Sequence, residues 1–302
     1  MPLIAQFASV WLISVLLLLA QPQNQSDQPD VRLTSDLVLL NLTVTGPDRR
    51  YVRGLRADDF IVLEDGVAQQ ITTFSSQETP LAAAILLDVS GSMQQMVRIA
   101  RGAARNFASK LRADDVFALY VFADQATQLQ DFGSSPELDE RIWSLQAEGY
   151  TALYDCIYLA AKDLSQRPER RRAILLLSDG ADTKSSHTLD TCLRMASDAA
   201  VTIYAVNLTP PAHARRADSI AAAGVLQTLA EKTGGRYIDD PGGMRMYQAF
   251  EEILDELSHQ YTLGYSPTPE KRDGKWHKIE VKATKPNISI RTRQGYLAPK
   301  RN

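Results

Sequence analysis

Oxygen-bearing side chains cluster at three points of this 302-residue sequence. Asp88-Val89-Ser90-Gly91-Ser92 follows the apolar run 81–87, and Ser178-Asp179-Gly180 follows the apolar run 173–177. The third point is Gly149-Tyr150-Thr151, which precedes a segment with helical periodicity. Hard oxygen ligands of this kind suit Mg²⁺, Mn²⁺ or Ca²⁺ and do not suit zinc or copper. The candidate ligands are Asp88, Ser90, Ser92, Thr151 and Asp179.

The spacing within the first group supports a shared site. Asp88, Ser90 and Ser92 are two positions apart, so their side chains point the same way in an extended segment. In open α/β sheets, ligands gather beyond the carboxyl ends of the strands, where two of the three groups lie. Neutral hydroxyls leave a bound cation much of its positive charge. An open coordination position on that cation can then accept a carboxylate from another molecule.

The elements that must position these groups are apolar strands alternating with amphipathic helices. Strands without polar alternation, separated by helices, predict a doubly wound, mostly parallel α/β sheet covered on both faces. We expect strands at 81–87, 116–122, 173–177, 201–206 and near 236–238. We expect helices at about 96–111, 137–147, 152–165, 188–199, 217–232 and 244–259.

The segments on either side of this α/β region read as β-structure. Residues 38–45 and 277–283 alternate in polarity, which is typical of half-buried strands, and Asp65-Gly66 and Asp273-Gly274 are turn sequences. Each flank is short for an independent sheet. We therefore predict that residues 31–76 and 261–302 pair into one small β-domain, into which an α/β domain at 77–260 is inserted.

The first 20 residues form an apolar stretch followed by a polar linker at 21–30. An apolar core, a small residue and then a polar run are typical of a secretory signal peptide, although the first basic residue is Arg32. The length also approaches that of a membrane anchor, which is the alternative. No other apolar run approaches membrane length. We expect a protein secreted to the periplasm, the cell surface or the medium, with membrane contact only through an uncleaved N-terminus.

Composition excludes several functional classes. The chain has 33 Lys and Arg against 36 Asp and Glu, and this balance argues against a nucleic-acid partner. Four scattered histidines without an H-E-x-x-H pair do not predict a zinc hydrolase, and no esterase, dinucleotide or P-loop motif is present. Two cysteines, Cys156 and Cys192, are too few for a disulfide-built miniprotein and leave open either one disulfide or two buried thiols.

The three groups resemble a known family. The D-x-S-x-S at 88–92, the Thr151 loop and the Ser-Asp-Gly at 178–180 are similar to the metal-ion-dependent adhesion site of von Willebrand factor type A (VWA) domains. The flanking Leu63–Gly66, Tyr261–Ser266 and Arg291–Pro299 resemble those of bacterial, especially acidobacterial, secreted proteins with a related domain. The resemblance implies direct metal ligation by Ser90 and Ser92, direct or water-mediated ligation by Thr151, and mostly water-mediated contacts from Asp88 and Asp179.

These observations lead to three hypotheses. We expect a non-enzymatic, extracytoplasmic binding module whose VWA domain holds Mg²⁺, with Mn²⁺ or Ca²⁺ also suited, and engages an acidic group of a protein partner. The alternative is a metal-assisted hydrolase that uses the same ion as a Lewis acid, for which no histidine falls in the three loops. The third is a structural role of the β-domain with a vestigial metal site.

Overall fold

The computed structural model describes residues 37–76, 79–240 and 245–300. The expected signal segment and linker therefore lie outside the described residues. The described residues belong to one compact unit. Within the described ranges, no helix combines the length and the apolar character needed to cross a bilayer.

A six-stranded sheet forms the centre of this unit. Its strands β5 (Leu81–Asp88), β6 (Val116–Phe122), β8 (Arg171–Ser178), β9 (Val201–Asn207) and β10 (Tyr237–Asp239) are parallel, and β7 (Ala126–Gly133) is antiparallel to β6. The order is β10-β9-β8-β5-β6-β7. Every residue of β5 and β9 is buried, because helices cover both faces. The predicted doubly wound, mostly parallel α/β fold is confirmed.

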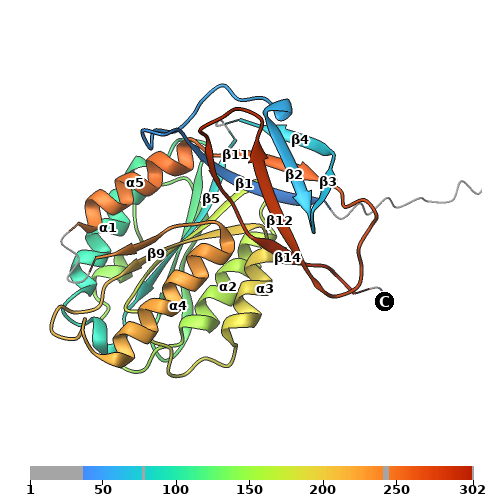
Figure 1. Cartoon of the computed structure of the whole chain (residues 1–302). Helices are drawn as coiled ribbons and strands as arrows, with labels where there is room; N and C mark the ends of the chain where they lie inside the picture. The colour runs from blue at the N-terminus through green and yellow to red at the C-terminus, as the bar shows by residue number, and fades with distance from the viewer. Residues whose placement is uncertain (1–36, 77–78, 241–244, 301–302) are drawn as a thin grey trace, which may run out of the picture. The chain divides into compact units, whose positions relative to one another are not determined.

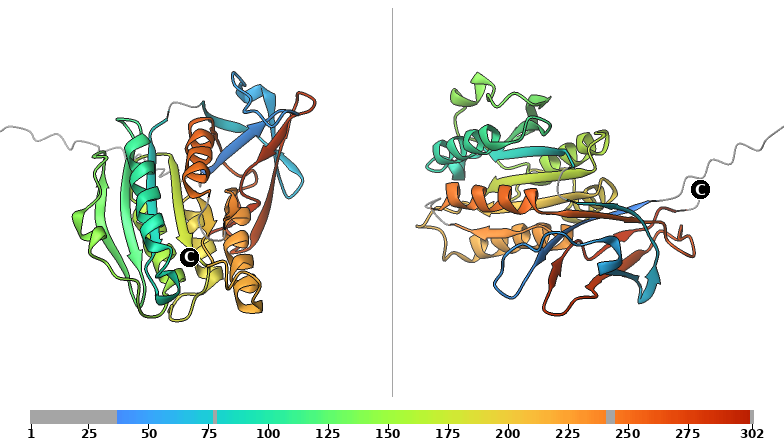
Figure 2. Two further views of the ribbon diagram at one scale, coloured as in Figure 1. Left: turned by 90° about the vertical axis from the view of Figure 1, so that its left-hand side faces the viewer. Right: turned by 90° about the horizontal axis from the view of Figure 1, so that it is seen from above.

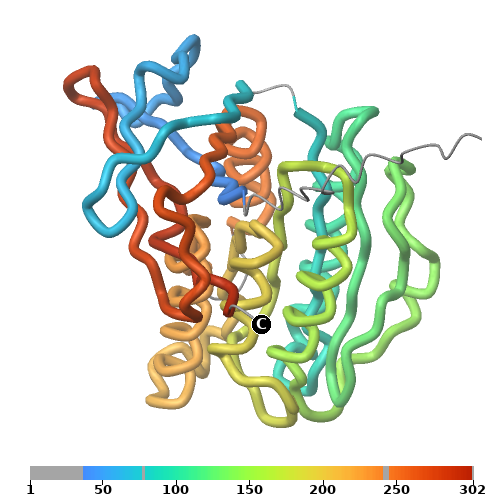
Figure 3. Tube along the Cα trace, turned by 90° about the vertical axis from the view of Figure 1, so that its right-hand side faces the viewer, coloured from blue at the N-terminus to red at the C-terminus, as the bar shows by residue number. Residues whose placement is uncertain are grey.

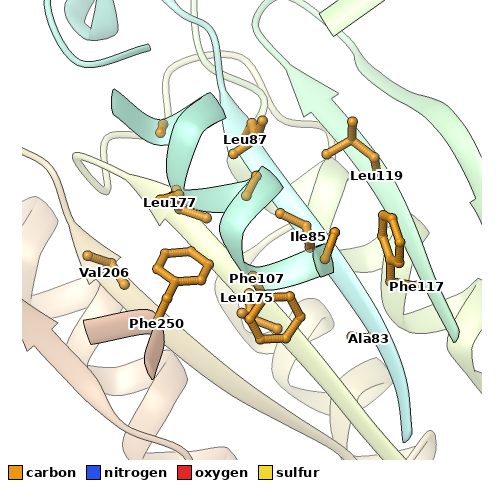
Figure 4. Close-up of a cluster of buried hydrophobic side chains, with 14 of the residues drawn as sticks. Ala83, Ile85, Leu87, Phe107, Phe117, Leu119, Leu175, Leu177, Val206 and Phe250 are labelled. Carbon is orange, nitrogen blue, oxygen red and sulfur yellow. The ribbon is translucent and has the colours of Figure 1, made fainter. Parts of the chain in front are cut away.

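Five helices cover the two faces of the sheet (Figures 1 and 2). Helices α1 (Val97–Lys110) and α5 (Met246–Ser258) pack on one face, where Phe107 and Phe250 meet edge to face with ring centroids 5.7 Å apart (Figure 4). Helices α2 (Leu153–Ser165), α3 (Leu189–Asp198) and α4 (Ala217–Thr233) pack on the other. Side chains of β5 alternate between the two cores: Ile85 and Leu87 face α1, whereas Ala84 and Leu86 face α2.

The two flanks of the chain lie side by side (Figure 3). One sheet has the order β13-β1-β11-β4, built from β1 (Val38–Thr45), β4 (Ile71–Ser75), β11 (Tyr261–Tyr265) and β13 (Ser289–Arg291). The other has the order β14-β12-β2-β3, built from β2 (Phe60–Glu64), β3 (Val67–Gln69), β12 (Trp276–Ala283) and β14 (Gly295–Leu297). Their apolar faces share one core. The β-structure expected from the flanks is present, and the domain boundaries stay predictions.

The segment before the Thr151 loop differs from expectation. The helix predicted at 137–147 is wrong: only Glu140–Trp143 forms a short 3₁₀ helix, capped by the Asp139 carboxylate, which accepts from the Arg141 amide. Only Leu138 and Ile142 of this segment are buried, so two apolar anchors hold it without a full helix. The next residue, Glu148, donates its amide hydrogen to the Val89 carbonyl of a neighbouring loop. Strands β3 and β7 are additions that the sequence pattern does not indicate.

Candidate metal site

The first loop begins where β5 ends. The Asp88 Oδ1 atom accepts a 2.9 Å hydrogen bond from the Ser90 amide, which turns the chain sharply after the strand. A 3₁₀ turn, Gly91–Met93, follows and leads toward α1. The Oγ atoms of Ser90 and Ser92 lie 3.1 Å apart. The D-x-S-x-S sequence therefore brings two hydroxyls within hydrogen-bond distance of each other, directly above a buried carboxylate.

Asp88 is fully buried, and both of its oxygens are occupied. Its Oδ2 accepts a 2.6 Å hydrogen bond from the Ser178 hydroxyl at the end of β8, and Ser178 Oγ in turn accepts from the Gly180 amide at 2.9 Å. Burial, with the negative charge of Asp179, raises the pKa of Asp88 to about 7, against the opposing effect of the hydrogen bonds from Ser178 and Ser90. Two carboxylates thus share a region of low polarity.

The second loop is joined to the first through the backbone. The Glu148 amide donates to the Val89 carbonyl at 3.0 Å, and the Gly91 amide donates to the Gly149 carbonyl at 3.2 Å. Gly149 has φ +82°, a conformation that favours glycine. A Cβ atom added at Gly149 would lie 3.0 Å from the Asp124 carboxylate, which also accepts from the Tyr150 amide. Glycine therefore lets this loop turn against its neighbours and deliver Thr151.

The second and third loops are also hydrogen-bonded to each other. The Thr151 amide donates to Thr183 Oγ1 at 2.9 Å, and the Thr183 amide donates back to the Thr151 carbonyl at 2.9 Å. In the third loop, Asp179 Oδ1 accepts from the Ala181 amide at 3.2 Å. Gly180 has φ +84°, and a Cβ there would lie 2.4 Å from the Ala222 carbonyl oxygen. Only glycine allows this loop to pack so closely on α4.

Four of the five predicted ligands line one cavity of about 350 Å³: Ser90, Ser92, Thr151 and Asp179. The fifth, Asp88, does not line the cavity; it is buried and accepts a hydrogen bond from the Ser90 amide. The structure thus brings all five side chains into one region at the carboxyl edge of the sheet, as the positions of the strand ends require.

Several residues at the site are not among the predicted ligands. Ser178 belongs to the Ser-Asp-Gly group at the end of an apolar strand, and the structure adds that it supports Asp88. Thr183 joins two loops across 32 positions, for which the sequence carries no local signal. His213 and Arg216 reach the cavity from the segment before α4. A histidine therefore lines the cavity, although none lies in the three loops.

Two other aspartates in this region have supporting roles. Asp182 accepts from the Tyr154 amide in the first turn of α2 and from the Ser185 hydroxyl, as a loop or capping residue does. Asp155 accepts from the amides of Ser186 and His187 and contacts the His187 ring. Neither lines the cavity.

Comparison with known proteins locates the family resemblance within the chain. Residues 83–181 match the family model of the von Willebrand factor type A domain, a range that includes all five predicted ligands. A search of curated protein sequences finds no match.

Among solved structures, the chain is similar to an aerotolerance-related membrane protein of Bacteroides fragilis, with 19% identity, a TM-score of 0.44, and coverage of 59% of this chain and 98% of that one. It is also similar to the vWF domain of the type V pili tip protein Mfa5 of Porphyromonas gingivalis, with 12% identity, a TM-score of 0.49, and coverage of 58% of this chain and 94% of that one. A von Willebrand factor type A protein of Catenulispora acidiphila has 12% sequence identity and a TM-score of 0.47, with coverage of 89% of this chain and 75% of that one. None of these likenesses bears on what the protein binds. Residues 83–181 are therefore similar to a von Willebrand factor type A domain, and the doubly wound sheet that contains them is consistent with that fold.

Proposed function

We propose that this VWA domain holds a divalent cation, Mg²⁺, and uses it to bind an acidic group of a protein partner outside the cytoplasm. The observation that carries the proposal is the convergence of Ser90, Ser92, Thr151 and Asp179 on one cavity above Asp88. Three loops from distant parts of the sequence supply these groups, and backbone hydrogen bonds tie the loops together.

The donor set fits a hard divalent cation. It consists of hydroxyl and carboxylate oxygens, with no sulfur or imidazole in the three loops, and such ligands favour Mg²⁺, Mn²⁺ or Ca²⁺. Asp88 and Asp179 lie close enough that the charge of one raises the pKa of the other. A divalent cation between them and the hydroxyls offsets this repulsion.

Hydrogen bonding in the site suggests which residues would bind the cation and which would orient them. Both oxygens of Asp88 are occupied by Ser90 and Ser178, so Asp88 orients groups near the cation and is not expected to bind it directly. The hydroxyls of Ser90, Ser92 and Thr151 line the cavity and would bind the ion. Neutral ligands leave the ion electrophilic toward an incoming carboxylate.

The rim of the cavity suits an acidic partner. Arg216 and His213 line it on the α4 side, and both are exposed. Tyr150, 63% exposed, lies beside the Lys184 ammonium, which is 5.5 Å from its ring centroid. The positive charges of Arg216, on the cavity lining, and Lys184, beside Tyr150, favour an acidic surface of a partner.

We further propose that the protein is not an enzyme. The hydrolase alternative is favoured by one observation: His213 lines the cavity and could act as a general base. Turnover of phosphoesters or peptides with Mn²⁺ that is abolished by both His213→Gln and Asp179→Ala would establish hydrolysis instead of binding.

Calorimetric titration of the full chain with Mg²⁺ tests the proposal. The unchanged chain and the control Ser109→Ala, an exposed serine on α1, should bind one Mg²⁺ per chain. Ser90→Ala, Asp88→Ala and Asp179→Asn should lose this binding. Equal Mg²⁺ binding by the unchanged chain and Ser90→Ala would overturn the proposed site. Capture of a partner from the native cell envelope, which EDTA and Ser90→Ala should both abolish, then tests the role in binding.

A further inference from the structure

A second cluster of metal-ligating side chains lies in the β-structure built by the flanks. Glu64 ends β2, Asp65 begins the turn that follows, and His277 lies on β12. One ligand atom from each of these residues lies within 4.8 Å of the other two. Asp65 and His277 are 212 positions apart and come together because β2 and β12 pair.

Glu64 has an oxygen without a hydrogen bond. Its side chain is fully buried, and the hydroxyls of Tyr265 and Tyr296 donate to Oε2 at 2.7 and 3.2 Å. Oε1 accepts no hydrogen bond, and it is the one buried carboxylate oxygen among the described residues with that property. Burying a carboxylate oxygen without a hydrogen bond is costly, and a metal ion would supply the missing partner.

Asp65 and His277 each have one side-chain atom that is held by another hydrogen bond. Asp65 Oδ1 accepts from the Lys278 amide at 2.9 Å, and His277 Nε2 lies 3.0 Å from Asp273 Oδ1. A carboxylate on the outer nitrogen of a histidine is the usual way of orienting a metal-binding imidazole. The other atoms of these two residues, Asp65 Oδ2 and His277 Nδ1, are hydrogen-bonded to each other at 2.7 Å and lie within 4.8 Å of a Glu64 carboxylate oxygen.

A cation from the chain itself already lies at this point. The Lys271 ammonium is 2.7 Å from Asp65 Oδ2, 3.3 Å from His277 Nδ1 and 3.7 Å from Glu64 Oε1. The last distance is too long for a hydrogen bond, so the ammonium does not satisfy the buried oxygen. The Lys271 side chain is 25% exposed and belongs to the loop between β11 and β12, so it can swing toward solvent.

We propose that Glu64 Oε1, Asp65 Oδ2 and His277 Nδ1 form a binding site for Zn²⁺, which displaces the Lys271 ammonium. One imidazole and two carboxylates suit zinc and not Mg²⁺ or Ca²⁺, and a water molecule completes four-coordination. Ligand atoms on a tetrahedral zinc lie roughly 3.4 Å apart, so the 2.7 Å contact between Asp65 and His277 opens slightly on binding. The ion would join the turn after β2 to β12.

Zinc titration of the full chain in excess Mg²⁺ tests this site separately from the VWA site. The unchanged chain should bind one Zn²⁺, and Ser90→Ala should bind it equally well. Glu64→Gln and His277→Gln should lose the binding. Asp273→Asn, which removes the carboxylate on the outer nitrogen, should weaken it by about 10- to 100-fold.

Lys271→Ala gives the decisive comparison, because it removes a partly exposed side chain and leaves the three ligands in place. Without the competing ammonium, zinc should bind about fivefold more tightly. Zinc binding that is unchanged or weaker in Lys271→Ala would overturn the proposal, whether or not the Glu64 and His277 variants fold. Loss of Mg²⁺ binding by Ser90→Ala with zinc binding retained would show that the two sites are independent.

Discussion

The Ser178 hydroxyl donates a 2.6 Å hydrogen bond to Oδ2 of Asp88, which joins the carboxyl ends of two neighbouring parallel strands, β8 and β5. The same hydroxyl accepts from the Gly180 amide and so also holds the loop that carries Asp179. Ser178 therefore supports two of the predicted metal-site residues without lining the cavity.

Replacing Ser178 should weaken metal binding without unfolding the protein. In Ser178→Ala, Asp88 loses one of its two fixed hydrogen bonds, and we expect about 10- to 100-fold weaker Mg²⁺ binding, as for other groups that orient metal ligands. Calorimetric titration measures this effect, with Ser109→Ala as the control. Mg²⁺ affinity equal to that of the control would contradict the supporting role of Ser178.

Magnesium should stabilise the folded protein. A ligand that binds only the folded state at about 100 times its Kd raises the free energy of unfolding by about 2.7 kcal/mol. We expect this increase for the unchanged chain in denaturant titrations with and without Mg²⁺, and no increase for Ser90→Ala. A similar increase in both proteins would place the stabilising ion somewhere else.

Asp155 should make stability depend on pH in the acid range. Burial opposes ionisation of its carboxylate, but the hydrogen bonds from Ser186 and His187 outweigh burial, so its pKa lies below the ordinary 3.8. The folded state then favours the charged form, and the stability it contributes is present above pH 3.8 and lost as the pH falls through the lowered pKa.

The variant Asp155→Asn separates this contribution from other acid effects. It should be less stable than the unchanged chain by about 1–2 kcal/mol near neutral pH. The difference should shrink between about pH 5 and about pH 2, as measured by urea unfolding at each pH. A difference that stays constant over this range would rule out the charge of Asp155 as its source.

Glu256 on α5 is a buried link between the central α/β layers and the flanking β-structure. It is 2% exposed, accepts from Thr43 Oγ1 at 3.0 Å and Tyr204 OH at 2.7 Å, and forms an ion pair with Arg291. Glu256→Ala should lower the free energy of unfolding by about 3–5 kcal/mol, because it removes the ion pair with Arg291 and the acceptor of two buried hydroxyls. On the same helix, the exposed Glu251 pairs with Lys110, and Glu251→Ala should cost less than about 1 kcal/mol. Equal losses in the two variants would contradict this link.

Both cysteines are free and buried, Cys156 on α2 and Cys192 on α3, and burial raises the pKa of each thiol. The sequence leaves open either one disulfide or two buried thiols, and the structure has two buried thiols. A thiol reagent should therefore detect no reactive thiol in the native protein and two in the unfolded, unreduced protein. Finding none after unfolding would indicate a disulfide.

Local sequence patterns are sufficient for the fold class and for the three loops of the candidate site. Residues 81–87 of β5 and 173–177 of β8 are apolar throughout, and the oxygen donors follow directly where those runs end. In a parallel sheet such ends meet at one edge, so the order of residues along the chain is enough to place Asp88 and Asp179 together. The alternating flanks likewise indicate strands that need a partner.

Other features depend on contacts between distant residues and cannot be predicted in this way. The segment 137–147 has a helical pattern, yet the residue that follows it, Glu148, donates its amide hydrogen to the Val89 carbonyl instead of extending a helix. No local sequence pattern predicts the contacts of Ser178 with Asp88, of Thr183 with Thr151, or of Glu64 and Asp65 with His277. Periodicity reports which face of one element is buried, whereas these groups are brought together by strand pairing and loop packing across 32 to 212 positions.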